Sequence, residues 1–199
     1  KAWAINGCVL PSFLQQNRGT FLSFAAASPV LAILLSFCGC LFWALGAHAQ
    51  SVICVLNADE IRGIVQFAQL NASHVRVSFN GSGIPHGVHG FHVHQYGDIS
   101  TGCAAAGGHF NPDSVNHGGP DAPVRHVGDL GNVEADRHGV VTFIRDDSYL
   151  QLSGDRSILG RAVVLHADPD DLGLGGYPDS LTTGHAGARI ACCVIVYAK

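Results

Sequence analysis

The sequence predicts an all-β fold. Gly accounts for 25 of the 199 residues, only 13% of residues are charged, and short runs of alternating apolar and polar residues recur along the chain. Turn-forming pairs such as Asn80-Gly81, His138-Gly139 and Gly154-Asp155 separate these runs. Many glycines and short polar connections suit a β protein with many turns better than a helical one. Eight short strands in one domain indicate a barrel or a sandwich.

The strands follow one another from residue 51 to the C-terminus. Period-two alternation and β-branched residues place them at 51–56, 61–70, 75–79, 91–94, 130–134, 140–145, 157–165 and 189–197. Two long connections remain, at about 96–125 and 166–188. Structureless loops of that length in a compact domain are usually functional.

An apolar, nearly uncharged segment at 21–47 precedes the strands and ends in Ala47-His48-Ala49, a small-x-small cleavage motif. We interpret 1–49 as a signal region that is removed, and 50–199 as the folded domain. The alternative is a membrane anchor through 21–47, because this stretch is long enough to span a bilayer. The cleavage motif and the onset of a strand pattern at Ser51 favour a secreted protein with no stable membrane association after cleavage.

The charge of the domain excludes one class of partner. Residues 50–199 contain nine Lys and Arg against all 15 Asp and Glu, a net charge of −6. Nucleic acid is therefore not an expected partner, because phosphate binding needs clustered basic residues. An anionic substrate would need local positive charge that overcomes the global field.

Histidines give the strongest chemical signal, since 11 of the 12 follow residue 50. His92 and His94 lie two apart on a predicted strand, so both rings point to the same face and can reach one metal ion. An H-x-H pair alone is a weak signal. His166 follows the apolar run 162–165, and a strand end delivers a rigid ligand.

A second set of ligands follows in the first long loop: three histidines and a carboxylate make a complete tetrahedral set for zinc, in His109, His117, His126 and Asp129. Six histidines and one Asp exceed a single four-coordinate site. Imidazole and carboxylate without thiolate suit Zn(II) and Cu(II). Two such sites need one bridging residue, and an imidazole has two nitrogens for that role. Spacing alone does not identify which histidine bridges.

Six segments resemble the signature segments of the copper/zinc superoxide dismutase family. They are GFHVHQYGD at 90–98, GGHFNP at 107–112, HGGP at 117–120, RHVGDLGNV at 125–133, DDLGLGG at 170–176 and GHAGARIAC at 184–192. The resemblance covers about 52–199 in order, with matching spacings. It implies an eight-stranded Greek-key β-barrel with two long functional loops, usually a homodimer. The implied activity disproportionates superoxide to dioxygen and hydrogen peroxide, here as antioxidant defence outside the cell.

The resemblance also implies a role for each site residue. Arg189 would dock superoxide beside the copper, and His109 would supply a proton to the departing peroxide. His89 matches a histidine that braces the copper side, and Asp170 matches a carboxylate that links the two metal sites. One copper and one zinc per chain are implied, copper on His92, His94, His109 and His166, and zinc on His109, His117, His126 and Asp129, with His109 as the bridge.

Four cysteines remain after residue 50, and a secreted domain favours disulfides. The resemblance implies that Cys103 pairs with Cys192. Cys54 lies in an apolar strand, where we expect a buried thiol. Cys193 stands where the family usually has Gly, so it could mispair or bridge two chains. Adjacent strand residues face opposite sides, which argues against both Cys192 and Cys193 reaching Cys103.

Two other functions compete with the enzyme. A binding protein that keeps the fold without redox chemistry would be expected to lose copper ligands or the arginine, but His92, His94, His109, His166 and Arg189 are all present. A copper chaperone would need a thiolate-rich transfer motif, and the one close cysteine pair outside the domain, Cys38-Gly39-Cys40, lies inside the apolar segment.

Two sequons remain outside the metal chemistry. Asn71-Ala72-Ser73 and Asn80-Gly81-Ser82 would be available to glycosylation in a secreted chain.

Overall fold

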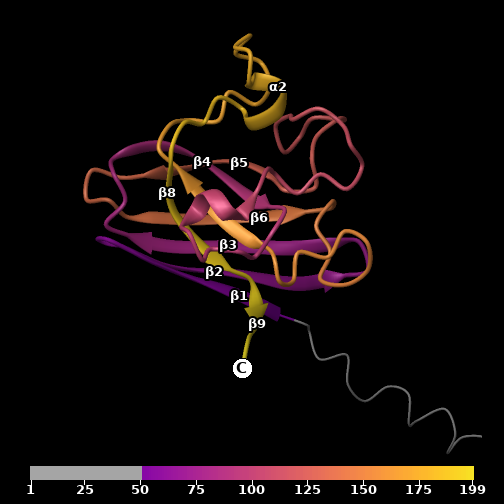
Figure 1. The fold of residues 1–199 in the computed structure, drawn as a ribbon. Helices are drawn as coiled ribbons and strands as arrows, with labels where there is room; N and C mark the ends of the chain where they lie inside the picture. The colour runs from indigo at the N-terminus through magenta and orange to yellow at the C-terminus, as the bar shows by residue number, and fades with distance from the viewer. Residues whose placement is uncertain (1–50) are drawn as a thin grey trace, which may run out of the picture. The chain divides into compact units, whose positions relative to one another are not determined.

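Two antiparallel sheets form the fold in the computed structural model, which describes residues 51–199 (Figure 1). The strand order is β6-β3-β2-β1-β9 in the first sheet and β5-β4-β7-β8 in the second. The elements are β1 (Ser51–Ala58), β2 (Ile61–Asn71), β3 (His74–Ser82), β4 (Gly87–His94), the 3₁₀ turn η1 (Cys103–Ala106), β5 (Asp129–Ala135), β6 (Val141–Asp147), β7 (Ala162–His166), the short helix α2 (Ser180–Thr183), β8 (Arg189–Val194) and β9 (Val196–Tyr197).

The connections between the sheets are Greek-key connections. β3 pairs with β6, and β4 pairs with both β5 and β7, so β7 returns to lie beside β4. β5 and β6 contact each other without belonging to one hydrogen-bonded sheet. The predicted all-β class and its eight strand regions are confirmed.

The C-terminal strand is where the predicted boundaries are wrong. We expect one strand at 189–197, but β8 pairs with β7 and β9 pairs with β1, so the chain crosses from one sheet to the other. The crossing residue, Ile195, is fully buried, and its N–H donates to the Arg161 carbonyl at 2.8 Å. Apolar residues continue through the crossing, which hides it from a pattern search. The strand expected at 157–165 also begins later, at Ala162, because Gly160 turns the chain with φ 76°.

Alternation on β4 places the histidines. Phe91 and Val93 point into the core between the sheets, and all four side chains from Phe91 to His94 are fully buried. His92 and His94 point to the opposite face, as the period of a strand requires. Their burial therefore comes from the loops that cover this face and not from the second sheet.

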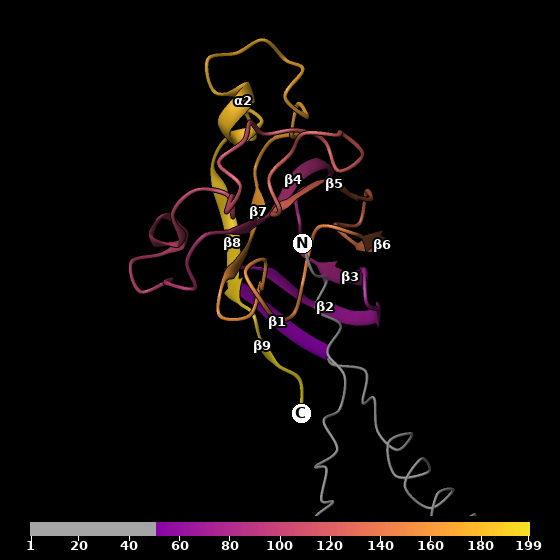
Figure 2. The ribbon, with the colours of Figure 1, turned by 90° about the vertical axis from the view of Figure 1, so that its right-hand side faces the viewer.

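The two predicted loops lie between β4 and β5 (95–128) and between β7 and β8 (167–188). Both bind β4 through their backbones: Phe110 N–H donates to the Val93 carbonyl and Gly90 N–H donates to the Asp168 carbonyl, each at 2.9 Å. The loops also contact each other, since His117 N–H donates to the Leu181 carbonyl at 2.9 Å. Figures 1 and 2 show them together at one side of the strands, beside α2.

Among residues 51–199 no helix is long and apolar enough to cross a membrane. The predicted signal region 1–49, and its alternative as an anchor at 21–47, lie outside the described residues.

Two disulfides converge on β8. Cys103–Cys192 ties η1 to β8, with a Cα–Cα distance of 5.7 Å, and Cys54–Cys193 ties β1 to β8 at 5.5 Å. The expectation of a free thiol at Cys54 is wrong, and Cys193 neither mispairs nor bridges two chains in this structure. The reason is strand alternation: Cys193 points into the core toward Cys54, while Cys192 points out toward the loop.

Removing the core disulfide should destabilise the fold while leaving the histidine clusters intact. For C54A/C193A we expect a loss of about 2–4 kcal/mol in the free energy of unfolding, because the cross-link no longer restricts the unfolded chain. Denaturant titration of both proteins measures the loss. Non-reducing peptide mapping that finds Cys54 as a free thiol in the wild type would contradict the assignment.

Candidate metal centre

The first cluster gathers four buried imidazoles from two strands and a loop: His92, His94, His109 and His166. One ligand atom from each ring lies within 4.8 Å of the others. The Nε2 atoms of His94 and His166 lie 3.3 Å apart, and the ring centroids of His92 and His109 lie 4.0 Å apart. His109 comes from the loop but is joined to the strand, because it forms an isolated β-bridge with His94.

The second cluster is centred on one oxygen atom. Asp129 Oδ1, at the start of β5, lies 2.8 Å from His109 Nδ1, 2.9 Å from His117 Nδ1 and 3.1 Å from His126 Nδ1. The other carboxylate oxygen accepts the backbone N–H of His126 at 2.8 Å, which fixes the carboxylate plane. Three nitrogens and one oxygen converging on one point are a tetrahedral ligand set for zinc.

Backbone carbonyls fix the orientation of three rings. The nitrogen that faces away from the cluster lies 2.9 Å from the Gly107 carbonyl in His94, 3.4 Å from the Gly187 carbonyl in His166 and 3.0 Å from the Val115 carbonyl in His126. A carbonyl accepts but cannot donate, so the proton sits on that nitrogen and the opposite nitrogen keeps its lone pair for the cluster.

A single carboxylate orients one ring from each cluster. Asp170 Oδ2 accepts from His92 Nε2 at 2.9 Å, and Oδ1 accepts from His117 Nε2 at 2.8 Å. Asn132 on β5 holds Asp170 by its backbone, through bonds of 2.7 and 2.9 Å. Gly184, with φ +64°, closes the space, since a Cβ there would lie 2.0 Å from Asp170 Oδ1. The far ring nitrogens are thus held where a metal ligand needs them.

Two buried ring nitrogens, His92 Nδ1 and His109 Nε2, have no hydrogen-bond partner among the described residues. A buried polar atom without a partner costs about 1–3 kcal/mol, so such atoms indicate a missing ligand. Both face the first cluster. His109 differs from the other five, because each of its two nitrogens faces a cluster. The residues present therefore fit two metal ions that share this ring.

The histidine rings differ in pKa, because burial lowers the pKa of a ring and a neighbouring carboxylate raises it. Burial lowers the pKa of His92 to about 3 and of His166 to about 4. Burial also opposes the charge on His117, but its hydrogen bonds to Asp129 and Asp170 outweigh it and raise the pKa of His117 to about 9. Burial also opposes the charge on the two carboxyls. The hydrogen bonds of Asp129 with His109, His117 and His126 outweigh it, as do those of Asp170 with His117 and His92, and they hold both carboxyl pKa values far below the ordinary value.

Arg189 begins β8 beside the first cluster. Its Nη1 donates to the Cys103 carbonyl at 2.8 Å and its Nη2 donates to the Gly107 carbonyl at 2.7 Å. The Gly107 carbonyl also accepts from His94, so guanidinium and ligand ring share one acceptor. The Cys103–Cys192 disulfide holds the same loop segment against β8. This arrangement places a fixed cation next to the first cluster.

Residues that are not ligand candidates also hold the site in place. His89 Nδ1 lies 2.9 Å from the His166 carbonyl and Nε2 lies 2.7 Å from the Pro85 carbonyl, so this ring joins β4 to the end of β7.

Two groups of the site were not predicted from the sequence, and Arg125 is the first. It is buried, and its Nη1 donates to the Asp129 carbonyl at 2.7 Å. Its position directly before His126 was the available signal. The Gly107 carbonyl, which accepts from His94 and Arg189, could not be predicted, because a backbone group leaves no pattern in the sequence.

Such a structure defines a class of protein: a Greek-key β protein with two adjoining, buried, nitrogen-rich clusters whose donor atoms suit Cu(II) and Zn(II).

Comparison with known proteins agrees with this class. The family model described as copper/zinc superoxide dismutase matches residues 61–195. A Cu-Zn superoxide dismutase of Paramecium bursaria Chlorella virus 1 is 51% identical over 150 residues, which cover 75% of this chain and 79% of that relative. The crystal structure of the clock protein EA4 has a TM-score of 0.74 and 44% identity, covering 77% of this chain and 98% of that one. The chain belongs to the copper/zinc superoxide dismutase family, a family of oxidoreductases.

Zinc binding should release a proton from His117. This ring is charged below about pH 9 in the metal-free protein, and its Nδ1 must lose that proton to bind a metal. We expect release of about one proton per zinc at pH 7, falling toward zero above pH 10. Calorimetric titration in buffers of different ionisation enthalpy measures it. As a control, copper added to the zinc-free protein at the first cluster should release fewer protons, because His92 and His166 are already neutral above about pH 4. A zinc-binding enthalpy that is independent of the buffer would contradict this.

Asp170→Asn should weaken metal binding at both clusters. An amide accepts through one oxygen only, so one of the two rings loses its acceptor and its fixed orientation. We expect zinc affinity to fall about 10–100-fold, measured by competition with a chelator. Asp168→Asn is the matched control, since Asp168 lies exposed on the same loop. Equal affinities in the two variants would show that Asp170 does not orient the rings.

Proposed function

We propose that the chain is an extracellular superoxide dismutase that holds one copper at the first cluster and one zinc at the second, with His109 as the bridge. The observation that carries this proposal is the position of His109, whose two ring nitrogens face the two clusters. The copper ligands would be His92, His94, His109 and His166, and the zinc ligands His109, His117, His126 and Asp129.

A bound copper ion would supply the one-electron oxidation and reduction that convert two superoxide anions and two protons into dioxygen and hydrogen peroxide. The second cluster joins three loop histidines to Asp129 on β5, so zinc bound there would order the loop and carry no redox chemistry.

His109 is the proposed proton carrier. Its Nε2 atom is buried in the first cluster and has no other partner among the described residues. In the metal-free protein, burial lowers the pKa of His109. The peroxide product needs a proton at this place, and His109 would deliver it from the ring nitrogen nearest the reacting oxygen atoms.

Arg189 is the proposed docking group for superoxide. The loop at 167–188 contains four Asp and no Lys or Arg, so the cation nearest the first cluster is the guanidinium at the start of β8. Its bonds to the Cys103 and Gly107 carbonyls fix its position, and two small residues, Gly187 and Ala188, precede it. A guanidinium remains protonated and offers several donors, which suits a small anion.

The extracellular location rests on two features. Two disulfides are formed among the described residues, and such bonds persist in oxidising environments. The predicted signal region 1–49 supplies the route to that environment, and cleavage after Ala49 would leave 50–199 as the working enzyme.

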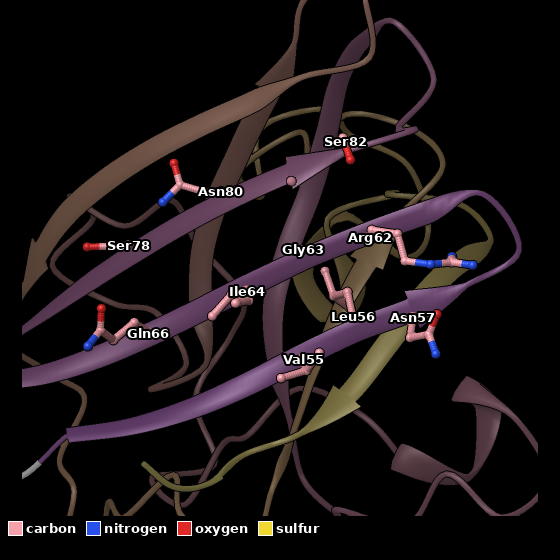
Figure 3. Close-up of a pocket in the computed structure, with 11 residues that line it drawn as sticks. Val55, Leu56, Asn57, Arg62, Gly63, Ile64, Gln66, Ser78, Asn80 and Ser82 are labelled. Carbon is pink, nitrogen blue, oxygen red and sulfur yellow. The ribbon is translucent and has the colours of Figure 1, made fainter. Parts of the chain in front are cut away.

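A homodimer is the proposed assembly, and an apolar patch supports it. Val55 and Ile64 face outward as register partners on β1 and β2, and each is about half exposed, at 53% and 52% (Figure 3). Val196 on the adjoining β9, which pairs with Ile53, extends the patch. Contiguous exposed apolar residues of this kind mark contact surfaces.

Loading residues 50–199 with copper and zinc and following superoxide decay by pulse radiolysis tests the enzyme. We expect rapid decay with one copper and one zinc per chain, abolished when copper is removed. Slow decay despite full copper content would favour the alternative, a binding protein that keeps the fold and the metals without redox turnover.

Arg189→Ala should lower kcat/KM by about 10-fold or more, because the local charge that attracts and docks the anion is lost. Arg189→Lys keeps the charge but not both carbonyl bonds, and should fall between the alanine variant and the wild type. Arg137→Ala removes an exposed charge from the turn between β5 and β6 and is the matched control. If both alanine variants reduced kcat/KM equally, Arg189 would have no docking role.

A further inference from the structure

The two sequons lie in different surroundings on the first sheet. Asn71-Ala72-Ser73 forms the tight turn between β2 and β3, whereas Asn80-Gly81-Ser82 lies within β3. Neither contributes to the metal clusters. We propose that Asn71, and not Asn80, carries an N-linked oligosaccharide; this inference rests on the secretion that the proposed function includes.

Asn71 is an accessible acceptor. The register pair Asn71–His74 closes a two-residue turn, and Asn71, Ala72 and Ser73 are all exposed. Asn-x-Ser at an exposed turn is the usual setting of an N-glycan in a secreted protein. No backbone group of the sheet interior has to move to give a large enzyme access to this side chain.

Hydrogen bonds of the turn prepare the Asn71 amide. Asn71 Oδ1 accepts from the Ser73 backbone N–H at 2.9 Å and from the Ser73 hydroxyl at 3.0 Å. His74 Nδ1 lies 2.9 Å from the same hydroxyl and can donate to it, which leaves the hydroxyl proton for Asn71. The amide nitrogen Nδ2 donates no hydrogen bond within residues 51–199, so it is free on the side away from Ser73.

The modification is a group transfer from a lipid diphosphate-linked oligosaccharide, the co-reactant. A bond forms between Asn71 Nδ2 and the anomeric carbon of the first sugar. The bond from that carbon to the diphosphate oxygen breaks, and the lipid diphosphate leaves with the electron pair. The amide nitrogen gives one proton to a base of the transferase. Because the contacts of the acceptor span only two residues, the turn can form before the sheet is assembled.

Asn80 is exposed as well, but it lacks the turn and its hydrogen bonds. It pairs with Ile64 on β2 and with Thr142 on β6, so its backbone lies inside the sheet. Its side chain lines a groove of about 870 Å³ together with Val55 and Ile64 (Figure 3). No hydrogen bond joins Asn80 to Ser82 in the part of the chain that the structure describes, since an extended strand holds side chains two residues apart without bringing them together. A glycan there would cover the apolar patch that the dimer needs.

The test expresses residues 1–199 in a eukaryotic secretory host as the wild type and as Asn71→Gln, Ser73→Ala and Asn80→Gln. Secreted protein is weighed by mass spectrometry before and after peptide N-glycosidase, which converts a glycosylated Asn to Asp, and the converted site is mapped. Superoxide dismutase activity is measured on the same samples.

We expect a single glycan on the wild type and on Asn80→Gln, converted at Asn71, with complete loss of the glycoform in Asn71→Gln and Ser73→Ala and unchanged activity in all four. Secreted, active wild type without a glycan would overturn the glycosylation alone. Loss of the glycoform in Asn80→Gln with its retention in Asn71→Gln would overturn the choice of site. A chain found only in the cytosol would overturn the extracellular role together with this inference, and a glycosylated but inactive chain would overturn the enzyme and leave the glycan standing.

Discussion

His109 presents one ring nitrogen to each of two buried clusters, and most of the surrounding structure serves to hold that ring. It belongs to a loop, yet its backbone bridges to His94 and the next residue bonds to Val93, so the loop is fixed to the central strand at this point. Asp129, 2.8 Å from Nδ1, sets the other side of the ring. Because a ring held on both sides cannot rotate, the two clusters keep a constant separation, and whatever changes one of them is felt by the other.

Burial makes this arrangement costly unless metals are bound. Six imidazoles and two carboxylates are almost completely removed from solvent, and the ring nitrogens His92 Nδ1 and His109 Nε2 have no partner among the described residues. Hydrogen bonds to backbone carbonyls and to Asp170 offset part of the cost of burying these groups. The buried Arg125–Asp147 pair, whose atoms lie 2.5 Å apart, contributes as well. Metal binding and the order of the first loop would therefore be one thermodynamic process, since that loop contributes three of the ligands, His109, His117 and His126, to clusters completed by strands of the second sheet.

The sequence predicted the parts of the site that obey a local rule. Alternation placed His92 and His94 on one face, and the strand end placed His166, because both depend only on neighbouring residues. Family resemblance was needed for the roles of Asp170 and Arg189, since both act across loops whose paths no short-range pattern defines. The pairing of Cys54 with Cys193 was missed because it joins residues 139 positions apart. The split of 189–197 at Ile195 was missed because a strand that changes sheets keeps its apolar pattern.

Neighbouring cysteines on β8 bind partners on opposite sides, one in the core and one in the loop beside Arg189. Oxidation of these cysteines therefore fixes the alignment of the last strand, whichever alignment is present when the bonds form. A shift of β8 by one residue against β7 would turn Cys193 toward the loop and Cys192 toward the core, and would also carry Arg189 away from the first cluster. The same two bonds could then close with exchanged partners and trap the wrong alignment covalently. A working site therefore requires β8 to pair with β7 in the correct register before its thiols oxidise. The order of these two events matters as much as the final set of contacts.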